Sequence, residues 1–141
     1  MGIMIEKVHT HIIEELQQNT RTDTVFIITS ILLNLLTLAI NSAVAGDHDK
    51  SATKWIVFFT FIVLVITVNL VAEIGIIKGK QTRHKLISGL LKMYKDQGVD
   101  GYYDPSLLNN YNLRYNLFML VVLVTGIIAI FVPVMLIRTT P

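Results

Sequence analysis

Four polar side chains recur inside an apolar run of the sequence at spacings of four, three and four residues: Ser30, Asn34, Thr37 and Asn41. At 100° per residue of an α-helix, these side chains fall within an arc of about 60°. An amide that faced lipid would lose hydrogen bonds worth several kcal/mol, so this polar stripe must face protein or water.

The polar stripe has two interpretations. It can hold helices together through hydrogen bonds between them, each of which stabilises the association by about 0.6–2 kcal/mol. It can instead line a hydrated path, which would require several copies of the chain, because three helices alone pack shut. One Asn would be enough to fix an interface, whereas the stripe follows the whole depth of the run. Its extent therefore favours the pore.

Asn69 and Glu73 lie one helical turn apart in a second apolar run, and Glu73 is about one turn from the end of that run. An acidic residue at this depth is energetically costly and marks a candidate functional position. In one interpretation, its carboxylate reaches the headgroups or pairs with Lys78, Lys80 or Arg114. In the other, a ring of Glu73 carboxylates forms the inner mouth of a cation pathway, with Asn69 as a second ligand.

The sequence offers little for catalysis. Glu6 and His9 form one Glu-x-x-His, the spacing of a di-iron ligand pair, but such a site needs a second copy, so a solvated helix face is the better interpretation. The chain has no cysteine and no catalytic or phosphate-binding motif. We therefore expect no enzyme, no cofactor and no metal site. No stacking aromatics alternate with the basic residues, so we expect no nucleic-acid partner either.

Three long apolar runs position these residues, at 24–45, 55–77 and 115–137. Charged residues make up only 16% of the 141 residues, below the quarter usual for soluble domains. Each run reaches the roughly 20 residues that a helix needs to cross about 30 Å of hydrocarbon. The sequence thus predicts an all-α integral membrane protein with three transmembrane helices in one domain, residues 1–141. The short connection between the first two runs predicts an antiparallel hairpin.

The basic residues predict the orientation. Nine Lys and Arg lie before the first run or in the loop 78–114, and three lie on the other side. Under the positive-inside rule, the N-terminus and this loop are cytoplasmic and the C-terminus lies outside.

Two further segments have amphipathic helical patterns. Residues 3–20 are expected to form an N-terminal helix, and their mixed charge favours packing on a neighbour over binding to lipid. Residues 81–96 are expected to form a cytoplasmic helix with Lys85, Lys92 and Lys95 opposite its apolar stripe. This helix suits either an anionic membrane surface or the N-terminal helix. Gly98, Gly101 and Pro105 are expected to end it.

The order of an N-terminal helix, a tight two-span hairpin and a charged helix carrying His84 and Tyr94 resembles the two-span SLATT-type effector domains of prokaryotic defence systems. The resemblance covers roughly residues 5–95 and leaves the third span unexplained. It implies a prokaryotic cell membrane and a protein that opens membranes by oligomerising.

The sequence therefore predicts a homo-oligomeric, cation-conducting channel or pore whose first span lines the path. The alternative is a non-catalytic membrane subunit or scaffold that binds another membrane protein through the polar stripe. In both cases the chain sits in a lipid bilayer.

Overall fold

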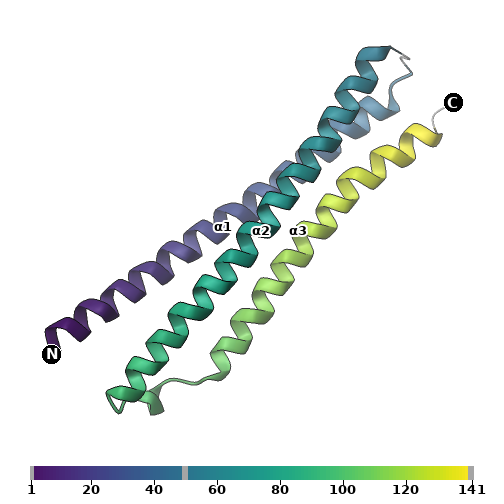
Figure 1. Cartoon of the computed structure of the whole chain (residues 1–141). Coiled ribbons are helices and arrows are strands. Elements are labelled where there is room, and N and C mark those ends of the chain that lie inside the picture. Colours follow the sequence, from purple (N-terminus) through teal and green to yellow (C-terminus); the bar gives the residue numbers. More distant parts are fainter. Residues whose placement is uncertain (1, 49–50, 140–141) are drawn as a thin grey trace.

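The computed structural model describes residues 2–48 and 51–139, which form three long helices (Figure 1). α1 runs from Gly2 to Gly46, α2 from Ala52 to Asp96 and α3 from Ser106 to Thr139, and a short 3-10 helix, η1, covers Asp100–Tyr102. All three long helices are apolar enough to cross a membrane, which indicates a multi-pass membrane protein.

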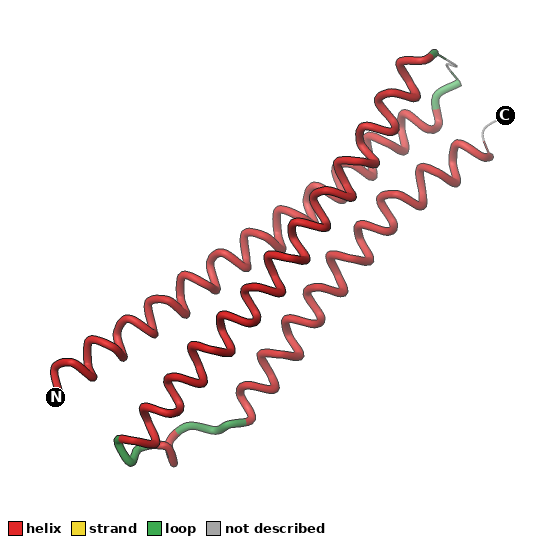
Figure 2. The backbone as a smooth tube through the Cα atoms, in the orientation of Figure 1, coloured by secondary structure: helices red, strands yellow, loops and turns green. Residues whose placement is uncertain are grey.

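The helices form one elongated bundle in which each runs antiparallel to the next (Figure 1). The N-terminus lies at the same end as the α2–α3 connection, and the C-terminus lies at the end where α1 leads into α2. In the described part of the chain, loops are found only at these two ends (Figure 2). The predicted hairpin of the first two spans is present.

The amphipathic segments predicted at 3–20 and 81–96 are helical, but they are not separate helices. They continue α1 and α2 without a break, and each of these helices is 45 residues long. Residues 17–24, QQNTRTDT, contain no Gly or Pro, so the backbone hydrogen bonds continue although the composition becomes polar. At about 1.5 Å per residue, α1 and α2 are each roughly 67 Å long, more than twice the hydrocarbon thickness.

The α2–α3 connection has the residues that such a turn requires. Gly98 has a φ of 66°, a left-handed conformation that suits glycine after a helix. An Asp104 carboxylate oxygen accepts a hydrogen bond from the backbone N–H of Ser106 at 2.9 Å, at the start of α3. This backbone hydrogen bond lowers the pKa of Asp104. The break expected at Gly98, Gly101 and Pro105 is confirmed.

The core is a seam of residues spaced three, four or seven positions apart, as in a coiled coil. On α2 it includes Phe58, Val65, Ala72 and Gly79, each seven residues from the next. On α3 it includes Tyr115, Val122 and Ala129, again seven residues apart. On α1 the buried side chains are mainly polar: Asp23, Ser30, Asn34, Thr37, Asn41 and Ala45. The polar stripe is therefore the α1 side of the core.

The bundle brings three predicted boundaries of the apolar runs to one level. The runs begin or end at residues 24, 77 and 115. In the structure, the Tyr115 hydroxyl donates to the Asp23 carboxylate, and the same carboxylate lies against Gly79. Boundaries that were assigned separately in three helices thus coincide, as expected for helices that leave one membrane at one face.

At the depth of the predicted spans, the surface is dominated by apolar side chains. Exposed examples from the three helices are Leu32, Leu36, Phe59, Val63, Leu70, Leu120, Ile127 and Phe131. The exposed hydroxyls of Thr60 and Thr67 donate to the carbonyls of the residues four positions earlier, at 2.7 and 2.8 Å. This surface suits contact with lipid chains.

Substitution of Gly79 tests how closely α1 and α2 approach. A Cβ at Gly79 would lie 2.0 Å from Asp23 Oδ1, whereas a Cβ at Gly89, also in α2, would meet nothing within 4 Å. Alanine favours a helix by about 1 kcal/mol over glycine at either position. We expect Gly79→Ala to lower the free energy of unfolding by roughly 1–3 kcal/mol, and Gly89→Ala not to lower it. Unfolding by SDS in mixed micelles measures both variants, and equal stabilities would contradict the close contact.

Candidate functional site

Hydrogen bonds of an amide cluster join all three helices near the middle of the predicted spans. Asn34 on α1 donates to Asn69 Oδ1 on α2 and to Thr125 Oγ1 on α3, both at 3.0 Å. Asn69 donates back to Asn34 Oδ1 at 2.7 Å. Asn34 is 1% exposed, whereas Asn69 and Thr125 are half-buried, so the α1 side of the cluster is closed to lipid and to water.

Gly126 provides the space for the amide cluster. A Cβ at this position would lie 2.5 Å from Asn69 Oδ1, too close for an ordinary contact. The glycine therefore lets the Asn69 amide approach the backbone of α3. Thr125, the residue before it, donates to the Val122 carbonyl at 3.0 Å while it accepts from Asn34.

The other residues of the polar stripe are also inside the bundle. Ser30 and Thr37 are both 2% exposed, and Asn41 is 0% exposed. Ser30 donates to the Phe26 carbonyl at 2.5 Å, and Asn41 donates to the Phe58 carbonyl of α2 at 3.3 Å. Among the described residues, Asn41 Oδ1 has no hydrogen-bond partner. All four side chains are thus buried inside the bundle, and Asn34 and Asn41 hydrogen-bond to a neighbouring helix.

A second set of polar residues, the edge cluster, lies where the polar ends of the helices begin. It comprises Asn19, Asp23 and Tyr115, with the Gly79 carbonyl. Asn19 donates to Asp23 Oδ2 at 3.3 Å and to the Gly79 carbonyl at 3.1 Å, and the Tyr115 hydroxyl donates to Asp23. Asp23 is only 5% exposed, so its carboxylate depends on these two donors for stabilisation.

Arg83 of α2 lies beside the edge cluster. Its Nη1 donates to Thr20 Oγ1 at 2.6 Å, and its guanidinium carbon lies 4.2 Å from the centre of the Tyr111 ring. A guanidinium fixed by one hydrogen bond and one aromatic face has a defined orientation. Within residues 2–48 and 51–139, its buried Nε has no hydrogen-bond partner.

Glu73 is half-buried, and its Oε1 is buried without a hydrogen-bond partner in the described part of the chain. Lys80, one of the bases that the sequence suggested as a partner, donates instead to Asn116 Oδ1 at 2.9 Å. Glu73 and Asn69 remain one turn apart on α2, but Asn69 is engaged with Asn34. The Asn69 amide therefore takes part in contacts between helices, whereas Glu73 Oε1 receives no hydrogen bond from the described residues.

The predicted membrane-surface residues Lys85, Lys92 and Lys95 are all exposed on α2. Because α2 continues past the predicted span, they lie roughly 12, 22 and 27 Å beyond Ile77 along its axis. Lys85 is therefore the nearest to the predicted membrane edge. Contact of these residues with a lipid surface stays a prediction.

In the described residues, the Glu-x-x-His of α1 is not part of a group of three or more candidate metal ligands. His9 instead contacts α2, where its Nε2 lies 3.2 Å from the Tyr94 hydroxyl. The Tyr94 ring in turn contacts that of Tyr103 at 6.0 Å between centroids. Sequence reasoning placed His9 on a solvated face, whereas it is half-buried between two helices.

Several polar contacts were missed at the level of sequence. Asn19 and Asp23 continue the spacing of the polar stripe toward the N-terminus, so a longer search along α1 would have included Asn19. Thr125 gave a weaker signal, because hydroxyl side chains are common in membrane helices. Arg83 belongs to a charged run, and its sequence position alone does not distinguish it from its exposed neighbours.

No protein-family model, no curated protein and no solved structure matches the chain.

A double-mutant cycle on Asn34 and Asn69 tests the amide cluster. Either single substitution by Leu leaves an amide without its partner, so we expect each to lower the free energy of unfolding by about 1–2 kcal/mol. The Asn34→Leu/Asn69→Leu variant removes both amides and should lose less than the sum of the two single losses. SDS unfolding of the four proteins gives the coupling free energy. Strict additivity would show that the two amides do not interact.

Proposed function

We propose that this protein is a non-catalytic membrane subunit or scaffold, anchored by three helices, that holds a partner at the end of the bundle where the N-terminus lies. The observation that carries the proposal is the distribution of polar and apolar groups. At the depth of the spans, the amides are bonded within the chain and the surface is apolar. Past the spans, α1 keeps apolar side chains uncovered.

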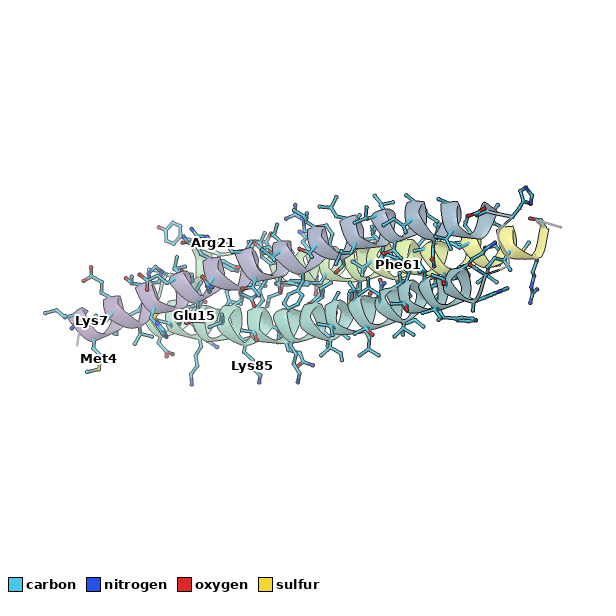
Figure 3. All side chains as sticks on the ribbon, turned by 90° about the horizontal axis from the view of Figure 1, so that it is seen from above. Met4, Lys7, Glu15, Arg21, Phe61 and Lys85 are labelled. Atoms are coloured by element: carbon cyan, nitrogen blue, oxygen red, sulfur yellow. The ribbon has the colours of Figure 1, made fainter. Side chains whose placement is uncertain are left out.

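The uncovered part of α1 is its first helical turns. Ile3, Met4 and Val8 are 73%, 71% and 47% exposed, although this part of the helix lies beyond the predicted span. α2 contacts α1 here through Tyr94 and His9, on another side of the helix. Figure 3 shows Met4 and Lys7 at the outer tip of the bundle, far from Phe61. Apolar side chains exposed to water in this way suit contact with another protein.

The partner contact proposed here lies on a different surface from the one that the sequence suggested for a scaffold. In that alternative the polar stripe was expected to bind another membrane protein, but its side chains are at most 2% exposed, and Asn34 and Asn41 hydrogen-bond within the chain. We assign the contact with a partner to residues 2–8 of α1 instead. The surplus of basic residues at this end supports a cytoplasmic location for it, with the C-terminus outside.

Two double variants test the partner contact in protein purified from its native membrane in mild detergent. Met4→Ser/Val8→Ser should remove a stoichiometric second polypeptide from the native complex, because it removes the apolar contact. The control, Val99→Ser/Tyr102→Ser, changes residues that are 40% and 95% exposed at the same end and should retain that polypeptide. A native mass equal to a multiple of one chain, unchanged in both variants, would rule out the contact.

A homo-oligomeric cation channel is the second candidate, and Glu73 is the observation that favours it. One of its carboxylate oxygens has no hydrogen-bond partner among the described residues and lies at the depth of the spans, where an acidic side chain is costly. With the polar stripe closed within each bundle, a path between copies would have to follow the Glu73 side of α2. A ring of these carboxylates would attract cations at one mouth.

Cation flux into proteoliposomes separates the two candidates. The scaffold proposal predicts no flux from the purified wild-type chain. The channel proposal predicts flux that falls at least tenfold in Glu73→Gln, because the substitution removes the charge but nearly retains the shape. Asn116 is an exposed polar residue on α3, and the control variant Asn116→Leu should not alter the flux.

A further inference from the structure

A pocket of about 370 Å³ opens between α1 and α3 at the level of the edge cluster, and α2 contributes Arg83 to it. Its lining combines two arginines, one carboxylate, two tyrosines, two threonines and two apolar side chains: Arg83, Arg114, Asp23, Tyr111, Tyr115, Thr20, Thr24, Ile27 and Phe118. Neither the partner contact nor the cation pathway uses this pocket.

The charge in the pocket favours an anion. The lining contains two guanidinium groups and one carboxylate, and that carboxylate already accepts hydrogen bonds. Asp23 Oδ2 accepts from Asn19 and Tyr115, and Oδ1 lies toward Gly79 of α2. The guanidinium groups are therefore only partly compensated.

Arg83 is pre-organised to bind such an anion. Thr20 fixes one nitrogen of its guanidinium and the Tyr111 ring covers one face, yet its Nε has no partner among the described residues. Arg114 is exposed on α3 at the same pocket. Both arginines line the same opening. A guanidinium group can donate two parallel hydrogen bonds to phosphate oxygens, which a lysine ammonium group cannot do.

The pocket also crosses the boundary between polar and apolar surface. Ile27 and Phe118 belong to the predicted spans, and Phe118 is 44% exposed beside the pocket. Thr20, Arg83 and Arg114 lie just past the boundary. A ligand with a phosphate at one end and hydrocarbon at the other would meet complementary groups along its length.

We propose that this pocket binds the phosphate of an anionic phospholipid, with Arg83 and Arg114 on the phosphate and Ile27 and Phe118 along the first part of the acyl chains. Basic pockets between membrane helices on the cytoplasmic side are suited to such headgroups. The assignment is independent of the partner of α1, because it uses other residues and requires only the bundle and its membrane edge.

Retention of lipid by the purified full chain tests the site, with native mass spectrometry in mild detergent as the measurement. Wild-type protein should retain one phosphatidylglycerol per chain in preference to phosphatidylcholine. Arg114→Gln should weaken retention roughly tenfold, the effect of losing one charged hydrogen-bond donor. Arg21→Gln makes the same substitution at an exposed residue of α1 that does not line the pocket, and this variant should retain the lipid like wild type.

A second variant separates orientation from net charge. Thr20→Val leaves the charge unchanged but removes the hydrogen bond that fixes Arg83, so it should also weaken retention. Equal retention in Arg114→Gln and Arg21→Gln would show diffuse attraction and overturn the proposal. Displacement of the lipid by millimolar inorganic phosphate would assign the pocket to a soluble phosphate and overturn the lipid as its source.

Discussion

The constraint on which this structure depends is that an amide in an apolar environment must find a hydrogen-bond partner in the protein. Asn34 and Asn69 meet this constraint in each other and in Thr125, and thereby tie α1, α2 and α3 together at one level. Other features follow from it. Gly126 must lack a side chain to admit the Asn69 amide, and the outer surface can be almost wholly apolar because the strongest polar groups are inside.

The same seam continues past the predicted membrane edge, where the types of polar side chain in it change. Within the spans it uses neutral amides and hydroxyls, whereas at the edge it uses a carboxylate, a phenol and an amide. A charged group is tolerated where water is near and would be costly deeper in the bundle. Glu73 departs from this order, since a carboxylate oxygen at the depth of the spans has no donor among the described residues. This departure makes Glu73 the position within the spans where a charged group is least compensated.

The apolar runs and the spacing of the polar stripe were enough to predict three helices, their approximate depth and the common face of Ser30, Asn34, Thr37 and Asn41. They were not enough to predict what covers that face. The periodicity of one helix gives the direction of its side chains, but the neighbour that meets them depends on packing of the other two. Helix ends were missed for a related reason: hydropathy reports where the surroundings change, whereas α1 and α2 continue for as long as their backbone hydrogen bonds do.

Because α1 is one unbroken rod, its behaviour in a membrane has a mechanical consequence. Residues 2–22 project roughly 30 Å beyond the predicted span. A change of about 10° in the tilt of the span would therefore carry the tip of the helix sideways by about 5 Å. Membrane helices adjust their tilt to bilayer thickness. In a membrane, this geometry would give the first turns of α1 the mechanics of a lever arm, because a small change in tilt at the span becomes a larger displacement at the tip.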